Sequence, residues 1–306
     1  NPDTDMSYED LIYYIDKYYS YAEYIFIDEI TFVKGFVQGC ATLYDVYSAN
    51  GKRIVISGND SYVLLCAEGS GLYHRIFIKN ITFISYSELK RTGGIDTFDD
   101  YVKYGGLYRN DRLDNSYKLK TYVNTPVIDN IMHTIVKNKE ISFSDGIKDI
   151  DSDNLRLIVY QIIFAISYSL VFKEKSFNAS FVINLFKSNN SYSKSELSKL
   201  LKDELGIDDS IKVSKYEVQE VLNILEEINL VIKFENLYDG AYKYYITNPS
   251  IFNTLLYMMI SILAKARLQK EKDKSMIRIP DILFEAAVIN HAYVKAREMG
   301  YEVGFY

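Results

Sequence analysis

Two adjacent carboxylates follow a short apolar run near the start of the chain. The run covers residues 24–27, and Asp28 and Glu29 come directly after it. If the run is a strand of a parallel sheet, both acids lie at its carboxyl edge, where α/β folds bind ligands. An aspartate there can hold Mg²⁺ through water, and the neighbouring glutamate can polarise an attacking water in nucleotide hydrolysis. Taken alone, the pattern is more often a core strand that leaves the interior for solvent.

A second apolar run ends in small polar residues, and an arginine opens a third. Ser57 and Asn59 follow the run 53–56, and their side chains could sense a γ-phosphate or orient the water. Arg75 opens the run 75–83, and its guanidinium could reach a phosphate of a neighbouring subunit as an arginine finger. The alternative for Arg75 is an arginine at a strand edge in solvent.

The elements that would position these side chains alternate in type. We expect strands at 24–27, 53–56 and 75–83, and helices at 7–20, 32–48 and 60–67, with Ser7 as the first N-cap. Continuous apolar runs are typical of parallel strands that are buried on both faces. The alternation therefore predicts a parallel sheet with right-handed crossovers.

The rest of the chain is predominantly helical in its pattern. Helices are predicted at 87–91, 97–104, 117–138, 153–172, 251–268 and 281–298, and a strand begins at Tyr301. Between 176 and 250 the order is three helices (177–187, 193–205, 214–228) and two strands (230–236, 241–246) around a turn at 238–240. Three helices followed by a hairpin predict a winged helix, a variant of the helix-turn-helix.

The order of these motifs resembles the predicted AAA+ superfamily ATPases of bacteria and archaea. The matching segments, in order, are IFIDEI (25–30), SGNDS (57–61), GLYHR (71–75), FISYSELKR (83–91) and FDDYVKYGGL (98–107). In that family they are a Walker B strand, a sensor loop, a loop arginine, a helix start and a Tyr-x-x-x-Gly-Gly motif. His74 stands where the family often has Gly, and Leu89 replaces an aromatic residue.

The resemblance implies a fold, a set of roles and a cofactor. The fold would be α/β plus α: a partial parallel-sheet, AAA+-like (P-loop NTPase) core, a helical region and a winged helix. The boundaries would be 1–110 for the ATP-binding domain, 111–175 for a connector, 176–250 for the winged helix and 251–306 for the start of an endonuclease-like domain. ATP and Mg²⁺ would be the cofactors. Asp28 would bind Mg²⁺, Ser57 would bind nucleotide, and the catalytic residues would be Glu29, Asn59 and Arg75.

The chain departs from the family at two points. A phosphate-binding loop needs the pattern GxxxxGK[ST], which occurs nowhere in the sequence. Of the acids that an endonuclease-like domain needs, only Glu285 is present. We expect a chain cut at both ends or a degenerate member, with neither ATP hydrolysis nor nuclease activity. The segment 281–306 is expected to pair with another chain or to be a removable appendage.

Composition limits the other classes of function. The chain has 306 residues, a net charge of −6, two cysteines and three histidines without metal-ligand spacing. These values predict a reduced, cytoplasmic protein that has no disulfide framework and no general attraction to nucleic acid. The longest apolar stretch, 251–264, is too polar and too short to cross a membrane.

The charge of the winged-helix segment decides between its possible partners. Residues 191–249 contain seven lysines and eleven acids, and the candidate recognition helix from Ser214 to Ile228 contains four glutamates. Because a helix that reads DNA neutralises phosphates, this segment favours a protein partner or a spacer role over DNA binding. A nucleic-acid-binding or protein-interaction module with a relic ATPase fold is the alternative function, and a homo-oligomer is possible.

Overall fold

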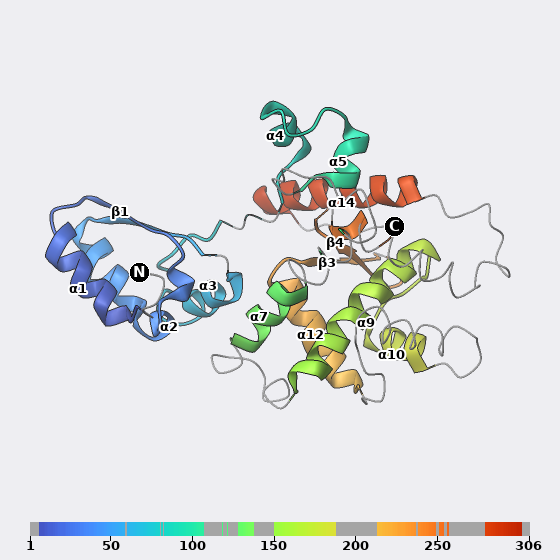
Figure 1. The fold of residues 1–306 in the computed structure, drawn as a ribbon, viewed down its shortest axis with the longest axis horizontal. Coiled ribbons are helices and arrows are strands. Elements are labelled where there is room, and N and C mark those ends of the chain that lie inside the picture. The colour runs from blue at the N-terminus through green and yellow to red at the C-terminus, as the bar shows by residue number, and fades with distance from the viewer. Residues whose placement is uncertain are drawn as a thin grey trace. The chain divides into compact units, whose positions relative to one another are not determined.

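The computed structural model divides the chain into two compact units (Figure 1). Unit 1 is Asn1–Asn80 with Asn138–Ser142, and unit 2 is Ile81–Lys137 with Phe143–Tyr306. Among the described residues there are two sheets of two strands each, and most of the other elements are helices. The structure describes residues 6–58, 60–79, 81, 83–106, 118, 121, 128–137, 150–187, 213–236, 238–248, 251–253, 256 and 279–301.

Unit 1 begins with the predicted N-terminal helix. The Ser7 hydroxyl accepts a hydrogen bond from the Asp10 amide at 3.1 Å, and the Asp10 carboxylate accepts one from the Ser7 amide at 3.3 Å. This reciprocal capping box satisfies two amides that would otherwise lack partners at the helix start. The elements of unit 1 are α1 (Tyr8–Tyr19), β1 (Tyr24–Ile27), η1 (Ile30–Phe32), α2 (Phe36–Gly39), η2 (Leu43–Tyr47), η3 (Ser48–Asn50), β2 (Arg53–Ile56) and α3 (Ser61–Glu68).

The single helix predicted over 32–48 is wrong, because the chain forms short α, π and 3₁₀ segments there. Gly35 has a φ of 83°, outside the helical region, and it precedes α2. Gly39 lies against the ring of Tyr8, where a Cβ atom would approach the ring to 2.3 Å. The two glycines break the periodicity and let this segment wrap closely around α1.

The strands β1 and β2 form the predicted parallel pair. Their register runs from Tyr24 opposite Arg53 to Ile27 opposite Ile56. Ile25 lies in the buried core of unit 1, but Phe26 is 73% exposed and Val55 is 52% exposed. The expected burial of both strand faces is therefore wrong: helices cover one face only, and the apolar residues alternate between core and solvent.

The third strand predicted over 75–83 is not formed within the described part of that segment. Residues 76–79 have no ladder partner, and Phe77 and Ile81 are each 90% exposed. The boundary between the two units falls between Asn80 and Ile81. An apolar β-like pattern therefore lies in the connection between the units, and a complete AAA+ core sheet is not present among the described residues.

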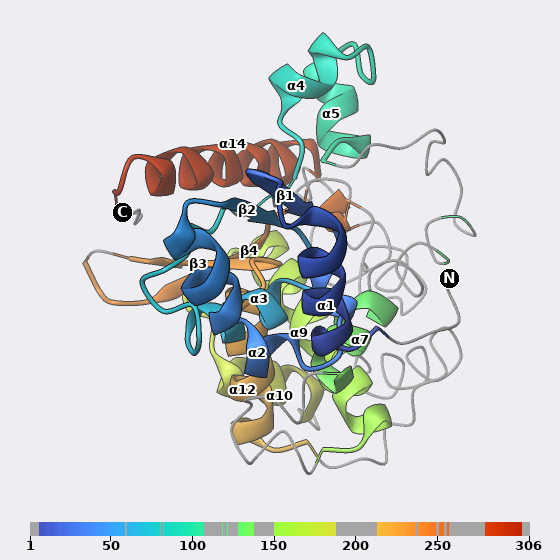
Figure 2. The ribbon, with the colours of Figure 1, turned by 90° about the vertical axis from the view of Figure 1, so that its left-hand side faces the viewer.

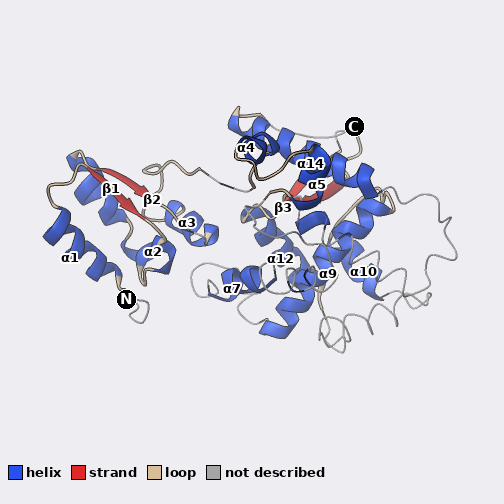
Figure 3. Ribbon diagram, turned by 45° about the horizontal axis from the view of Figure 1, so that its top comes forward, coloured by secondary structure: helices blue, strands red, loops and turns tan. Residues whose placement is uncertain are grey.

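Unit 2 is mainly helical (Figure 3). Its described elements are α4 (Tyr86–Arg91), α5 (Phe98–Tyr104), α7 (Asn130–Lys137), α9 (Ser152–Val171), α10 (Ala179–Lys187), α12 (Lys215–Glu227), β3 (Val231–Glu235), β4 (Tyr242–Ile246) and α14 (Ile279–Glu298). Among the described helices, α9 alone is long and apolar enough to cross a membrane. Most of α9 is buried against α7, α10 and α12, as in the core helix of a globular unit.

Part of the predicted winged helix is present in unit 2. The strands β3 and β4 pair antiparallel, with Val231 opposite Ile246, and Gly240 adopts a φ of 66° in the turn between them. A capping box between Ser214 and Glu217 begins α12, which packs against α10 and β3. The helix predicted over 193–205 lies outside the described residues, so the complete winged helix stays a prediction.

The helix α14 packs directly on this hairpin (Figure 2). The Tyr245 hydroxyl donates to Glu285 at 2.8 Å. The buried Asn290 side-chain amide donates to the carbonyls of Ile246 and Thr247, at 2.9 and 2.8 Å. With Leu283, Ala286 and Ala287 also buried, α14 belongs to the core of unit 2 and is no removable appendage. The strand predicted from Tyr301 onward lies outside the described residues, except for Tyr301 itself.

Candidate functional site

The carboxyl edge of the β1–β2 pair brings Asp28, Glu29 and Ser57 together. The Ser57 hydroxyl donates a hydrogen bond to the Asp28 carboxylate. The backbone supports this contact, since the Ser57 amide donates to the Ile27 carbonyl and the Ile30 amide donates to the Ser57 carbonyl, each at 2.9 Å. The two residues that follow the paired strands therefore face the same edge, as the sequence predicted.

Glu29 adopts a backbone conformation that is unfavourable for its residue type. Its φ and ψ are 55° and 40°, in the left-handed region, where it precedes η1. A non-glycine residue there costs about 1–2 kcal/mol. The sharp turn carries the chain from the end of β1 directly into η1, so Asp28 and Glu29 occupy one tight corner. Such strain persists where the surrounding structure holds it, and it is common at functional sites.

Gly58 lets the loop after β2 lie close to η1. A Cβ atom at Gly58 would come within 2.3 Å of the Thr31 methyl carbon, so no other residue fits without a shift. Asn59 lies outside the described residues, and its catalytic role stays a prediction. Asp60 is buried and accepts a hydrogen bond from the Val63 amide at 3.4 Å as the N-cap of α3. An aspartate just before a helical run could have indicated this cap from the sequence.

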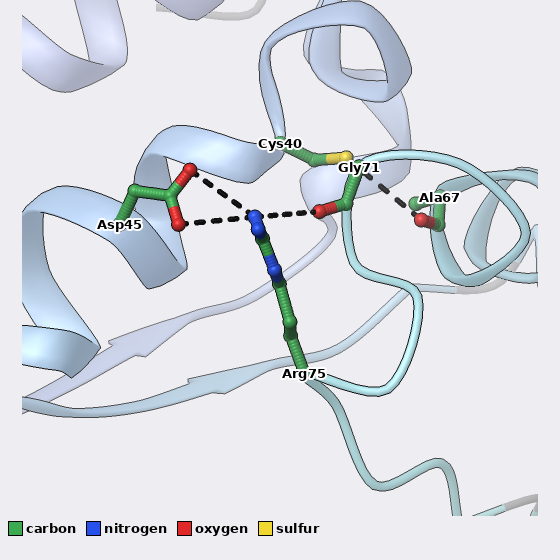
Figure 4. Close-up of polar contacts among 5 residues, drawn as sticks. All are labelled: Cys40, Asp45, Ala67, Gly71 and Arg75. Carbon is green, nitrogen blue, oxygen red and sulfur yellow. Dashed lines mark hydrogen bonds and ion pairs between the residues drawn. The ribbon is translucent and has the colours of Figure 1, made fainter.

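Arg75 is held by an acid on η2 (Figure 4). Its Nη1 lies 3.0 Å and 3.1 Å from the two carboxylate oxygens of Asp45, and it also donates to the Gly71 carbonyl at 3.4 Å. The guanidinium stands over the Tyr44 ring, 5.2 Å from its centroid. A role as an arginine finger would require this ion pair to open. Because exposed pairs are worth at most about 1 kcal/mol, opening would cost little.

The thiol of Cys40 lies beside this cluster (Figure 4). It is buried and donates to the Val37 carbonyl at 3.2 Å. Burial raises the pKa of the Cys40 thiol, which favours the unreactive protonated form. Cys40 is therefore a buried, protonated thiol that contributes to the core of unit 1.

The Tyr-x-x-x-Gly-Gly motif has a structural role in the packing of unit 2. Tyr101 is fully buried, and its hydroxyl donates to the Ile84 carbonyl at 3.0 Å and lies 3.3 Å from Nε2 of His291 on α14. A Cβ atom at Gly105 would meet the Tyr101 ring at 2.3 Å, and the Gly106 carbonyl accepts from the Ile84 amide at 2.9 Å. The motif therefore holds together the two ends of the segment that contains α4 and α5.

The helix that the family resemblance begins at Ser87 begins one residue earlier in the structure. The expected start is Ser87-Glu88, but α4 begins at Tyr86 with Ser85 as its N-cap. The Ser85 hydroxyl accepts a hydrogen bond from the Glu88 amide at 3.3 Å, so Ser85 is the cap and both Ser87 and Glu88 lie inside the first turn. The sequence pattern therefore located this helix to within one residue of its observed start.

Two glutamates of the candidate recognition helix are partly removed from water. Burial raises the pKa of Glu226, which is hydrogen-bonded to Tyr244, and burial also raises the pKa of Glu227. Glu285, the expected remnant of a nuclease site, is bonded to Tyr245 of β4. Glu226 and Glu285 therefore form hydrogen bonds within unit 2, whereas Glu227 lies at the exposed surface of α12.

The oxygen atoms at the β1–β2 edge suit a hard cation. Mg²⁺ is usually held by one or two carboxylates together with waters and substrate phosphates, so Asp28 with the Ser57 hydroxyl fits part of such a set. In the part of the chain that the structure describes, no group of three or more His, Cys, Asp or Glu could hold a metal ion. The Asp28 carboxylate and the Ser57 hydroxyl are thus oxygen donors of the kind that a hard cation prefers, and they do not by themselves make up a metal site.

Comparison of the chain with protein-family models, curated proteins and solved structures found no match.

Proposed function

We propose that the chain carries the acidic part of a magnesium–nucleotide site and acts as an AAA+-type, ATP-responsive switch. The observation that carries the proposal is the Asp28–Ser57 contact at the carboxyl edge of a parallel strand pair. That edge is where parallel α/β sheets bind ligands. The left-handed Glu29 beside it supports the same reading, because the strain is kept where glycine or asparagine would relieve it.

Each residue has a distinct task under this proposal. Mg²⁺, when bound, neutralises the charge on the β- and γ-phosphates. Asp28 holds the cation through water, and the Ser57 hydroxyl fixes the orientation of the Asp28 carboxylate. Glu29 polarises water and leaves nucleotide affinity unaffected. Arg75 stays on Asp45 until a phosphate competes for its guanidinium.

Magnesium-dependent nucleotide binding tests this proposal. A fluorescent ATP analogue should bind the full chain weakly, with Mg²⁺ present and not with a chelator. Asp28→Asn should weaken binding about tenfold, the effect of losing roughly 1.4 kcal/mol. Glu29→Gln should leave it unchanged, and Glu23→Gln, at the opposite end of β1, is the matched control. The absence of any magnesium-dependent binding would contradict the proposal.

Turnover separates binding from catalysis. A phosphate-binding loop supplies most contacts to the β- and γ-phosphates, and its pattern GxxxxGK[ST] occurs nowhere in the sequence. We therefore expect this chain alone to release no phosphate from ATP above background. Phosphate release that disappears in Glu29→Gln would show that the chain has a complete catalytic site.

The second candidate is a protein-interaction module built on α12 and the β3–β4 hairpin. It is favoured by the acidic composition of that segment, which disfavours a nucleic-acid partner. We expect no binding of duplex DNA at physiological salt. Nanomolar binding that is lost in Lys215→Glu would instead make this segment a DNA reader.

A further inference from the structure

On the exposed face of the β1–β2 pair, three pairs of neighbouring side chains follow one another along the strands. The register places Tyr24 beside Arg53 and Phe26 beside Val55, and Asp28 beside Ser57 continues the alternation past the strand ends. All six residues are exposed, and Tyr24, Phe26 and Val55 are each more than half exposed. We call these six residues the outer ladder.

The two ends of the outer ladder carry opposite charges, and its centre is apolar. The Arg53 guanidinium lies at its amino end, 5.4 Å from the centroid of the Tyr24 ring. Phe26 and Val55 form an apolar centre. The Asp28 carboxylate lies at the carboxyl end. A cation, an apolar patch and an anion therefore follow one another along about three residue pairs, roughly 10 Å or more of strand.

This order is self-complementary under a two-fold rotation. If two copies place their outer ladders face to face with opposite strand directions, Arg53 of one copy meets the partner's Asp28, and the reverse pair forms at the other end. The apolar centres then meet at the axis. A two-fold interface needs this property, in which one patch contacts its own copy. A parallel strand pair also gains the second covering layer that parallel sheets normally have.

We propose that the outer ladder is a dimerisation surface for a second copy of this chain. Its apolar centre supplies the burial, and the two Arg53–Asp28 pairs set the antiparallel orientation. Because the patch is small, the total buried area falls in the range below about 1,200 Å², which is typical of weak, transient association. The dimer surface shares Asp28 and Ser57 with the proposed nucleotide site, but it needs neither Glu29 nor a cation, so it can be tested without nucleotide.

A charge exchange measured by sedimentation equilibrium tests the proposal. The full chain without nucleotide should form a dimer at high concentration and dissociate on dilution. Arg53→Asp alone and Asp28→Arg alone should each raise the dimer dissociation constant about tenfold or more, because each places like charges opposite one another. The double variant should return the dissociation constant close to the original value, because both pairs are rebuilt with reversed sign.

Phe26→Ser provides a second variant that alters no charge. It should also weaken the dimer, and circular dichroism should show the fold unchanged because the side chain is largely exposed. The proposal is overturned if the chain is monomeric at every concentration, which would leave the ladder to another protein. It is also overturned if the single charge variants dimerise normally, or if the double variant fails to recover. Weakened dimerisation in Phe26→Ser with intact magnesium-dependent nucleotide binding would separate the two proposals, because Phe26 has no role in the nucleotide site.

Discussion

The two sheets of this protein are similar in size and opposite in environment. In unit 2, Val231 and Ile232 are consecutive residues of β3, and both are buried, because α12 packs on the hairpin from one side and α14 contacts β4. In unit 1, Ile25 is buried, and the next residue, Phe26, is 73% exposed. The comparison shows that an apolar run predicts a strand, whereas the covering elements decide how many of its faces are buried.

The polar residues of the two units differ in the same way. In unit 2, Asn290, Tyr245 and Glu285 are used to join α14 to β4. In unit 1, Asp28 and Ser57 lie exposed at a strand edge and bond to one another. Polar side chains whose hydrogen bonds are made within the protein are not available to bind a ligand. Under the proposed function, the ligand-binding residues therefore lie in unit 1, the unit with the less completely covered sheet.

The largest effect should follow from removal of α14. Deleting residues 279–306 exposes the hairpin and removes the contacts of Leu283, Ala286 and Asn290, so unit 2 should lose its cooperative thermal unfolding. Calorimetry of the deleted and full-length chains measures this loss. Unchanged unfolding of the deleted chain would mean that α14 is an appendage after all, and the contrast between the two sheets would fail.

A smaller loss of stability should follow from substitution of one buried side chain of α14. Asn290→Leu removes two hydrogen bonds and leaves the carbonyls of Ile246 and Thr247 without their donor, at a cost of about 2 kcal/mol. Asn223→Leu, at an exposed position of α12, is the matched control and should change the free energy of unfolding by less than about 0.5 kcal/mol. Equal effects of the two substitutions in urea unfolding would refute the structural role of Asn290.

The stability of unit 2 should depend on pH through Glu226. Burial raises its pKa above the ordinary value of 4.5, so the folded state keeps a proton that the unfolded state has released. Stability should therefore fall as the pH rises from about the ordinary value through the raised pKa. Glu226→Gln should flatten this dependence and stabilise unit 2 at neutral pH, whereas the exposed Glu235→Gln should not. A pH profile of melting temperature that is unaltered by Glu226→Gln would contradict the assignment.

The smallest change in stability should come from glycine substitutions at two residues whose backbone is in the left-handed region. Glu29 in unit 1 and Asn229 in unit 2 both have a φ of 55°. Glu29→Gly should stabilise unit 1 by about 1 kcal/mol, because glycine adopts this conformation without strain. Asn229→Gly should not stabilise unit 2, because asparagine tolerates the conformation and accepts a hydrogen bond from Arg297. Chemical unfolding of both variants provides the measurement, and destabilisation by Glu29→Gly would remove the argument from strain.

Local signals in the sequence predicted much of the fold. Ser7 with Asp10 located α1, the 238–240 turn located the β3–β4 hairpin, and the apolar runs located β1 and β2. Each of these signals acts between residues close in sequence, or through the simple periodicity of a strand. The meeting of Asp28 and Ser57 was also predictable, because parallel neighbours end at one edge of a sheet.

Long-range packing accounts for what could not be predicted. The run 75–83 has the composition of a strand, but no described strand pairs with it. The close contact of Gly39 with Tyr8 broke the expected helix over 32–48. Likewise, the pairing of Arg75 with Asp45 joins residues 30 positions apart, and no local pattern marks it. The side chain of Asn290 likewise had no signal that distinguished it from an exposed asparagine.

The most direct test of the proposed nucleotide site is to locate the residues whose environment changes when Mg·ATP binds. Amide resonances of the isotope-labelled full chain should be recorded by NMR while Mg·ATP is added, with ATP plus chelator as the reference. The account predicts magnesium-dependent shifts at Asp28, Glu29 and Ser57, which Asp28→Asn abolishes and Glu23→Gln preserves. Shifts absent from these three residues, or unaffected by Asp28→Asn, would contradict the claim that the β1–β2 edge is a nucleotide site.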